Sequence, residues 1–427
     1  NFASPDQLVG YFKTTPNNVG VGMFNFSSII ESYVSPDYEG LKAYTSNSGP
    51  IAGSQYKTGV QTHPIHLIDK YSLNKNAVRY FAVQFLIEYS TTVHGDVIMD
   101  STEAVNSDKY IAFNGVLQYD DILEYNTINY GYNLQNNNFL PFDSGTGADK
   151  FLTNAPKTQY ARLTDYGTLP FLQFMPDVLN YVQEISNRYY DSAGSLLASE
   201  TIVVNPANGG TGTLLVQETV TNLVYAGVFP ANLRGWNSQF AQQLAAGADI
   251  AYYTVQATTA VGGLMDPYTI NIICPNERGY EGIRLTWLNQ WGAWDYYTFN
   301  MKSIKSISTN KSTWTQLGGT WNEDLYKIAG YKGGKKNLRV NATEKIKLNT
   351  DFVTEEEGQW FEELINSPEV YIVNEYSTDV ANTITNKYIE PVRLTTSSYI
   401  KKTVANDKLM QYTIEIEKSK TKRTQAV

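Results

Sequence analysis

The sequence has little of several residue types, and each shortage excludes a class of protein. Cys274 is the single cysteine among 427 residues, which excludes an intramolecular disulfide and a zinc site built from several thiolates. Charged residues make up only 18% of the chain and hydrophobic residues 42%, a balance opposite to that of disordered chains. Apolar runs are interrupted every few residues, so none reaches the roughly 20 residues that a membrane-spanning helix needs. We therefore expect a folded chain without membrane insertion.

The chain is acidic overall, with one basic stretch near its C-terminus. The formal net charge is -9 and the isoelectric point is near 5.0. Proteins that coat nucleic acid need clustered lysine and arginine, so we expect no direct binding to nucleic acid. The basic stretch runs from Lys332 to Lys347. Such a run is usually a solvated strand face, and a docking surface for an acidic partner is the alternative.

The composition favours β-structure. Aromatic residues make up 13% of the chain, including 32 Tyr, and Tyr, Val, Ile and Thr favour pleated, half-buried surfaces. The predicted fold is mostly β, with β-sandwich-like modules in several domains and a few short helices. Short strand candidates at a spacing typical of β-sandwiches fill the central part of the chain, at residues 168–174, 181–189, 201–204, 214–220, 224–229, 250–257 and 268–273.

Composition shifts divide the chain into three predicted domains. A Gly-rich segment at 143–147 ends an N-terminal β-domain of residues 1–147. A central β-sandwich-like domain follows over residues 148–282, and a C-terminal β-domain over residues 283–427. The last residues, 418–427, are basic and are expected to fray.

Two segments carry strong local signals. Residues 76–89 alternate as a strand does, and one alternate set, from Arg79 to Tyr89, is largely apolar, so this face is expected to pack on a core. Thr354 followed by Glu357 fits a capping box, in which a hydroxyl and a carboxylate satisfy each other's free backbone donors. This box predicts a capped helix over residues 355–366.

Few residues suggest metal or catalytic chemistry. His63, His66 and Asp69 lie close together, and their side chains are of types that bind divalent ions. The proline between the two histidines opposes the helical alignment that would bring them together, so we expect His66 to be a half-buried polar group. Asp120 and Asp121 are the one candidate pair for a glycosidase, yet they follow a strand and fit a turn. We predict no catalytic residue, no bound metal and no cofactor.

Two regions are candidates for contacts with other proteins. Trp291 and Trp294 lie in a predicted hairpin over residues 283–301 and are either assembly contacts or core residues, because Trp is enriched in both places. Lys332, Lys335 and Lys336 lie in the basic stretch. Their replacement by Glu is expected to weaken association if that face docks an acidic partner.

Five segments spread over nearly the whole chain carry a family resemblance: residues 16–34 (PNNVGVGMFNFSSIIESYV), 63–85 (HPIHLIDKYSLNKNAVRYFAVQF), 151–172 (FLTNAPKTQYARLTDYGTLPFL), 285–302 (LTWLNQWGAWDYYTFNMK) and 348–371 (LNTDFVTEEEGQWFEELINSPEVY). They are similar to virion structural proteins of tailed bacteriophages, of the β-rich tail, baseplate or collar type. None of the segments is a catalytic motif, so the resemblance implies no active-site residue. Chains of this family usually begin with a further strand, so the resemblance implies a first domain truncated at its start.

The resemblance implies a structural, non-enzymatic part of a tailed-phage particle, in its tail, baseplate or neck region. Such a protein works through contacts with other virion proteins and with copies of itself, so a homo-oligomer is expected. The implied location is the virion, with assembly in the host bacterial cytoplasm, where thiols stay reduced. The polar residues 126–147 are a candidate arm for a neighbour's sheet edge.

Two other classes of function stay open at this point. A carbohydrate- or receptor-binding adhesin of the particle would expose aromatic rings in a shallow groove, where sugars stack on them. A glycan-degrading enzyme would place two carboxylates across a cleft. The sequence does not separate exposed rings from buried ones.

Overall fold

The computed structural model gives the secondary structure of the chain over a series of segments. It describes residues 8–36, 71–74, 77–107, 110–116, 151–173, 182–203, 222–235, 238–259, 265–273, 279–320, 326–374, 389–396 and 410–424. Strands predominate among these residues, so the prediction of a mostly β, multi-domain chain is confirmed.

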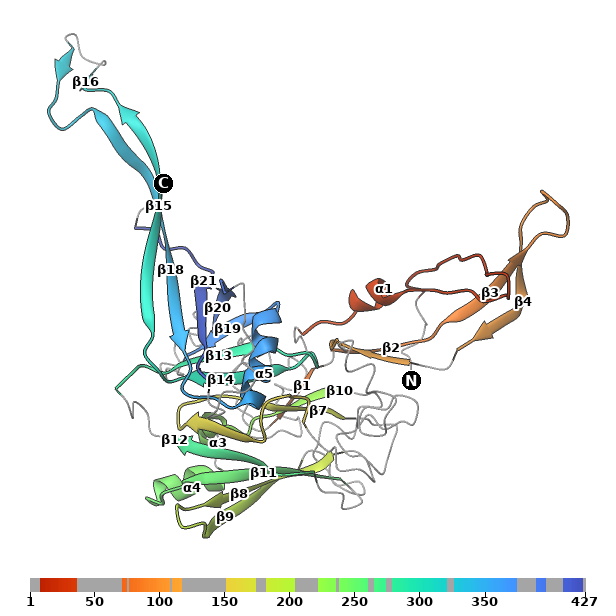
Figure 1. Cartoon of the computed structure of the whole chain (residues 1–427), viewed down its shortest axis with the longest axis horizontal. Helices are drawn as coiled ribbons and strands as arrows, with labels where there is room; N and C mark the ends of the chain where they lie inside the picture. The colour runs from red at the N-terminus through yellow and green to blue at the C-terminus, as the bar shows by residue number, and fades with distance from the viewer. Residues whose placement is uncertain are drawn as a thin grey trace, which may run out of the picture. The chain divides into compact units, whose positions relative to one another are not determined.

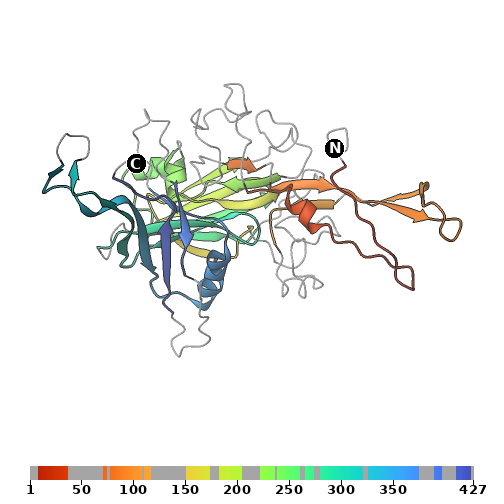
Figure 2. The same cartoon turned by 90° about the horizontal axis from the view of Figure 1, so that it is seen from above.

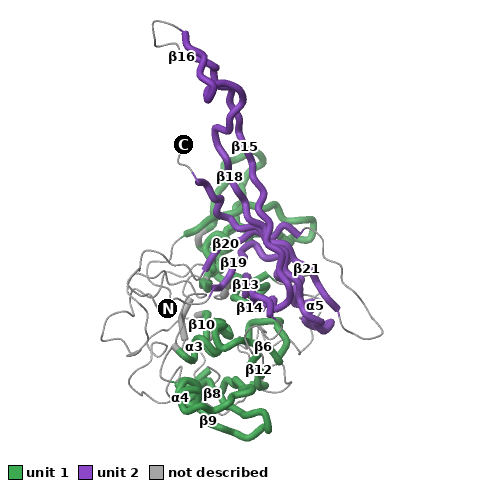
Figure 3. The backbone as a smooth tube through the Cα atoms, turned by 90° about the vertical axis from the view of Figure 1, so that its left-hand side faces the viewer, with its two compact units in different colours: residues 1–273, 288–295 green, residues 274–287, 296–427 purple. Residues whose placement is uncertain are grey.

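The chain forms two compact units, coloured separately in Figure 3. The first unit contains residues 1–273 together with 288–295, and the second contains 274–287 and 296–427. The tip of one hairpin, residues 288–295, therefore belongs to the first unit although both flanking segments belong to the second. The division into three domains at residues 147 and 282 stays a prediction.

Among the described residues, the first unit contains three short helices and most of the strands. They are drawn in Figures 1 and 2. Its elements are α1 (Ser27–Glu31), β1 (Tyr71–Asn74), β2 (Val78–Phe81), β3 (Gln84–Tyr89), β4 (Ile98–Asn106), β5 (Tyr110–Phe113), β6 (Thr158–Arg162), β7 (Leu169–Gln173), β8 (Val182–Tyr190), β9 (Leu196–Val203), β10 (Asn222–Ala226), α3 (Pro230–Gly235), α4 (Gln239–Ala245), β11 (Tyr252–Thr259) and β12 (Tyr268–Ile273).

A sandwich of two sheets forms the centre of this unit. One sheet has five strands in the order β6-β12-β11-β8-β9, and the other has three in the order β1-β10-β7. All pairs are antiparallel except β12 with β6, which is parallel. The strands expected between residues 168 and 273 are confirmed, except that 214–220 lies outside the described residues.

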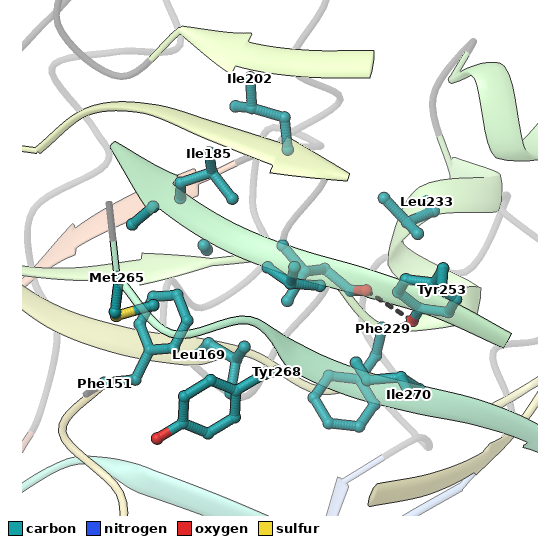
Figure 4. Close-up of a cluster of buried hydrophobic side chains, with 14 of the residues drawn as sticks. Phe151, Leu169, Ile185, Ile202, Phe229, Leu233, Tyr253, Met265, Tyr268 and Ile270 are labelled. Atoms are coloured by element: carbon teal, nitrogen blue, oxygen red, sulfur yellow. Dashed lines mark hydrogen bonds between the residues drawn. The ribbon is translucent and has the colours of Figure 1, made fainter. Parts of the chain in front are cut away.

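Both sheets contribute side chains to one buried cluster (Figure 4). Phe171 of β7 and Val224 of β10 lie in the same cluster as Val255 of β11 and Ile270 of β12. Alternate residues of a strand point to opposite faces, so each of these strands supplies every second residue to the cluster. Tyr253 is also buried here, and its hydroxyl donates a hydrogen bond to the Val228 carbonyl at 2.7 Å.

The second unit is built on one large sheet with a helix packed against it (Figure 3). The sheet has seven strands in the order β14-β13-β19-β20-β21-β18-β15, and a separate pair joins β16 to β17. The elements are β13 (Ile283–Leu288), β14 (Trp294–Phe299), β15 (Ile304–Gln316), β16 (Gly319–Thr320), β17 (Lys327–Ile328), β18 (Gly334–Asn349), α5 (Glu355–Asn366), β19 (Val370–Val373), β20 (Ile389–Leu394) and β21 (Thr413–Lys418).

Helix α5 covers the core of the second unit with aromatic side chains. The ring of Trp360 lies 4.9 Å from that of Trp287 on β13, and the ring of Phe361 lies 4.7 Å from that of Tyr297 on β14. The helix begins at the predicted capping box, in which the Thr354 hydroxyl and the Glu357 carboxylate exchange backbone hydrogen bonds. The predicted helix over residues 355–366 is confirmed with the same limits.

The basic tail is held in place over its described part, contrary to the expectation that it frays. Ala342 and Lys422 exchange two backbone hydrogen bonds of 2.9 Å each, and Lys422 also donates to the Glu344 carboxylate. The backbone pairing and the charge together fix this tail beside β18, because carboxylate and ammonium groups form stronger hydrogen bonds than neutral ones.

Candidate interaction surfaces

Trp291 and Trp294 are buried inside the first unit. Their side chains are 2% and 0% exposed, and the Trp291 indole N–H donates a hydrogen bond to Asn154 Oδ1 at 3.2 Å. Of the two alternatives that the sequence left open for these residues, the structure places them among the core residues. A partner has no access to either ring in this fold.

A buried amide organises the turn that carries these two tryptophans. Asn289 Oδ1 accepts hydrogen bonds from the backbone N–H groups of Trp291 and Ala293, both at 3.0 Å. Its Nδ2 donates to the carbonyl of Leu152 at 2.9 Å. One side chain thus closes the turn and ties it to a segment 137 residues away.

The same turn lies against residues 114–116. The N–H of Val116 donates to the carbonyl of Gln290 at 2.7 Å. Gly292 has a φ of +70°, and a Cβ at this position would overlap the carbonyl oxygen of Asn114. Glycine is therefore required here both by the left-handed backbone and by the close approach.

Lys332, Lys335 and Lys336 lie at the far end of a long two-stranded hairpin of the second unit. We call residues 304–320 and 326–341 the ribbon. It consists of β15, the first half of β18 and the small β16–β17 pair between them (Figures 1 and 3). Lys336 Nζ donates to the Tyr331 carbonyl at 2.9 Å, and the Lys332 ammonium lies 5.8 Å from the Tyr331 ring centroid. Lys335 is exposed.

The ribbon extends beyond the sheet from which it starts. Strand β18 pairs with β21 only over residues 345–349, whereas its pairing with β15 continues from residue 347 to residue 334. Residues 304–315 of β15 are all exposed, so both faces of this strand meet solvent. Apolar side chains are also exposed along the ribbon: Ile304, Ile307, Trp314, Leu317, Tyr326, Ile328, Tyr331 and Leu338.

The ribbon is basic throughout its described part. It carries seven cations and no carboxylate, namely Lys305, Lys311, Lys327, Lys332, Lys335, Lys336 and Arg339. Lys305 has an ion-pair partner, Glu281, at 2.6 Å. Within the described residues Lys311, Lys335 and Arg339 have no ion-pair partner. The ribbon is therefore a concentrated positive surface on an acidic chain.

A second exposed element lies in the first unit. Residues 8–26 lie beside the hairpin of β3 and β4 and turn back at residues 17–21 (Figure 2), and we call these two pieces the N-terminal arm. Lys13 forms an ion pair with Glu88 at 2.8 Å, and the ring of Phe24 lies 6.2 Å from that of Phe85. Within the described residues β3 and β4 pair with no third strand.

The N-terminal arm exposes apolar side chains that the sequence predicted to be buried. The sequence predicts one strand over residues 76–89, and the described residues of this segment contain two, β2 and β3. Phe85, Ile87 and Tyr89, on the face expected to pack on a core, are 44%, 61% and 44% exposed. That prediction is wrong for β3. Other large apolar residues of the arm are exposed as well: Leu8, Tyr11, Val19, Val21, Met23, Val93, Val97, Ile98, Met99 and Val105.

Buried ionisable groups in the described residues have structural partners. Arg162 donates to the buried Asp165 through its backbone N–H, Nε and Nη2. The Tyr189 hydroxyl donates to Glu200, which also accepts from the backbone N–H of Gln239 at 2.8 Å. Burial raises the pKa of Tyr189 well above its ordinary value, so this hydroxyl stays protonated as a donor.

Several residues that the sequence raised as candidates lie outside the described residues. They are His63, His66, Asp69, Asp120, Asp121, Cys274 and the segment 126–147. Among the residues that the structure does describe, no group of three or more His, Cys, Asp or Glu side chains could hold a metal ion. No helix in that part of the chain is long and apolar enough to cross a membrane.

The sequence interpretation missed strand β15 and the exposed rings of the ribbon tip. The sequence of β15, IKSISTNKSTWTQ, places Ser and Asn on one face and Lys and Thr on the other, so both faces are largely polar. A β-strand that is polar on both faces has no core to cover, and this pattern is the signal that identifies a projecting ribbon. No family model matches the chain, and comparisons with curated proteins and with solved structures found no match.

Proposed function

We propose that the chain is a structural, non-enzymatic component of a tailed-phage particle, from its tail, baseplate or neck region. It works through protein–protein contacts with other virion proteins and with copies of itself. Assembly takes place in the bacterial cytoplasm and the final location is the virion. The resemblance of the five segments to virion proteins supports a place in a tailed-phage particle. The exposed surface of the N-terminal arm supports a role in assembly.

The single observation that carries the assembly role is the apolar exposure of the N-terminal arm. Monomeric proteins seldom leave large contiguous apolar patches in water, because burying them is worth about 25 cal/mol per Å². An isolated two-stranded hairpin is also marginally stable at best in water. The β3–β4 hairpin has both properties, since Ile87 and Met99 are 61% and 55% exposed. A partner that covers this arm would remove both costs.

The test replaces apolar side chains on one face of the arm. Ile98 is the cross-strand partner of Tyr89, and Ile87 lies two residues from Tyr89, so both isoleucines are on the same face. Ile87→Lys/Ile98→Lys is expected to reduce self-association at least tenfold, measured as molecular mass against concentration by light scattering. The circular dichroism spectrum stays unchanged, because exposed side chains contribute little to stability.

A matched control carries the same change elsewhere in the first unit. Tyr160 and Leu196 are both 56% exposed on the central sandwich. Tyr160→Lys/Leu196→Lys is expected to assemble as the unmodified chain does. The role proposed for the arm would be contradicted if the arm variant and the control lost assembly to the same extent, or if both assembled normally.

The adhesin is the second candidate, and the ribbon tip favours it. Trp314, Tyr326 and Tyr331 are 42%, 65% and 77% exposed near the end of the ribbon. Exposed rings on a projecting element suit stacking against sugars. A glycan array distinguishes the two functions: binding that Trp314→Ala abolishes supports the adhesin, and no binding leaves the structural component.

A further inference from the structure

We propose that the ribbon docks on a second copy of this chain, in a heterologous contact between the positive ribbon and the acidic surface of its neighbour. This inference rests on the proposed function and names one of its partners. The argument uses the unpaired edge of the ribbon, its charge and the charge of the remaining chain.

Within the described residues, the ribbon offers a long strand edge to which no third strand is paired. Strand β15 is the last strand in the order of the seven-stranded sheet, and it has 13 residues. At about 3.4 Å per residue, this edge is about 45 Å long. The backbone N–H and C=O groups of every second residue point away from β18, and such an edge accepts further protein chain readily.

The charge of the ribbon excludes a contact between two ribbons. Lys305 and Lys311 lie on β15, and Lys335, Lys336 and Arg339 lie on β18, so the cations lie along both strands. Two ribbons side by side would bring seven cations on each into repulsion across a surface without carboxylates in its described part. An isologous dimer through the ribbon is therefore unfavourable.

The remaining chain has the complementary charge. Residues 304–341 contain seven Lys or Arg and two carboxylates, so the net charge of this segment is +5. The two carboxylates, Glu323 and Asp324, lie outside the described residues. Because the whole chain carries -9, all other residues together carry -14. The segment 349–374 alone contains seven carboxylates and no cation. Of these carboxylates, Glu355 and Glu356 at the start of α5 are exposed, so a copy of the chain presents acidic groups that the ribbon can meet.

A contact between different surfaces of identical subunits has a geometric consequence. Heterologous contacts produce a closed ring when the rotation between subunits closes, and a helical filament when it does not. Attraction between opposite charges also falls with salt, since the Debye length shortens from about 10 Å at 0.1 M to about 3 Å at 1 M. The proposed contact is therefore polar, directional and sensitive to salt.

The first experiment reverses charge at the end of the ribbon. Lys335→Glu/Lys336→Glu leaves Lys332 in place over the Tyr331 ring, so the tip keeps that contact. We expect at least a tenfold weaker self-association at low salt, measured by light scattering. The control Lys302→Glu/Lys420→Glu makes the same change of net charge at exposed lysines outside the ribbon and is expected to associate normally.

The second experiment mixes subunits to test direction. A Lys335→Glu/Lys336→Glu copy still has the acidic surface, so it accepts the ribbon of an unmodified copy but offers none. Adding it to the unmodified chain is expected to shorten filaments or open rings in negative-stain images. Multimers that keep their size when the Lys335→Glu/Lys336→Glu copy is present would overturn the proposal.

Other outcomes separate this inference from the proposed function. If Lys335→Glu/Lys336→Glu assembles normally while Ile87→Lys/Ile98→Lys does not, the ribbon contact is wrong and the assembly role stands. If the unmodified chain is a monomer at every salt concentration, both fail. A further outcome is that the unmodified chain binds a 20-base-pair DNA duplex, and that Lys335→Glu/Lys336→Glu alone loses this binding while its assembly is unchanged. This result would assign the ribbon to nucleic acid and overturn the contact between copies.

Discussion

Single buried polar side chains hold distant parts of the first unit together. Asn289 satisfies two backbone donors of its own turn and one carbonyl of another segment. A buried N–H or C=O group without a partner costs about 1–3 kcal/mol. Loss of the Asn289 amide would leave two N–H groups and one carbonyl without this partner, so the cost arises more than once.

Asn289→Ala is therefore expected to lower the free energy of unfolding by about 3 kcal/mol. Asn289→Asp keeps the acceptor for Trp291 and Ala293 but places a buried carboxylate oxygen against the Leu152 carbonyl, so this variant is also expected to be less stable than the original chain. Urea denaturation followed by tryptophan fluorescence measures both, because Trp291 and Trp294 lie in the same turn. An alanine variant as stable as the original chain would contradict this account of the turn.

The Glu344 carboxylate links the tail to β18 in a manner that depends on pH. The hydrogen bond from Lys422, with Lys418 at 3.8 Å as a further cation, lowers the pKa of Glu344 below its ordinary value of 4.5. A carboxyl whose folded pKa is depressed stabilises the fold above its unfolded pKa. That contribution is lost as pH falls through the folded pKa.

We therefore expect the tail to loosen as the pH falls below 4.5. Hydrogen exchange at the paired Ala342 and Lys422 amides, corrected for the intrinsic pH dependence of exchange, should show protection falling in that window. Glu344→Gln removes the titrating group, so its protection should be lower at neutral pH and nearly constant through the same window. Equal pH profiles for the two proteins would refute the role of this carboxylate.

The burial of Trp291 and Trp294 could not be predicted from their neighbours in sequence. Aromatic side chains are typical both of cores and of protein contacts, so their type leaves both alternatives open. Their burial depends on residues 114–116 and 152–154, which lie more than 130 positions away in the chain. No local pattern contains that information.

At the scale of elements, structures that depend on local signals were predicted well. Helix α5 begins at its capping box and has its apolar stripe within 12 residues. The hairpin of β13 and β14 and most of the central strands follow from alternation and turn residues in the same way. The order of strands does not, because the parallel pair β12–β6 and the pair β1–β10 join segments more than 100 residues apart.

The capping box of α5 gives a quantitative prediction for this element. Thr354→Ala removes the acceptor for the Glu357 backbone N–H at 3.2 Å and should cost about 1 kcal/mol of stability. Thr354→Ser keeps the hydroxyl and should cost only a few tenths of a kcal/mol. Thermal denaturation of the two variants measures the difference. Equal melting temperatures for alanine and serine would show that the cap does not stabilise the helix.

Strand β3 shows what an alternating pattern does and does not indicate. The period of two correctly predicts a strand with one apolar face. The pattern does not indicate whether the same chain or another chain covers that face. In β3 the apolar side chains are exposed, so the prediction of a core was wrong even though the strand was predicted correctly.

The two exposed elements of the molecule differ in chemistry. The N-terminal arm of the first unit exposes apolar side chains, and the ribbon of the second unit combines exposed apolar and aromatic side chains with a concentration of cations. Two surfaces of different chemistry on one chain suit different neighbours, so a symmetric assembly could use both without competition. Length, mostly β class and net charge were available from the sequence, whereas the positions of these surfaces required the fold.

The most direct test of the account is the mass of the purified chain in solution, measured by light scattering at low salt with negative-stain images of the same sample. The account predicts a multiple of the 47.9 kDa chain mass, seen as rings or filaments that dissociate as salt is raised. A species of 47.9 kDa at every protein and salt concentration would contradict it.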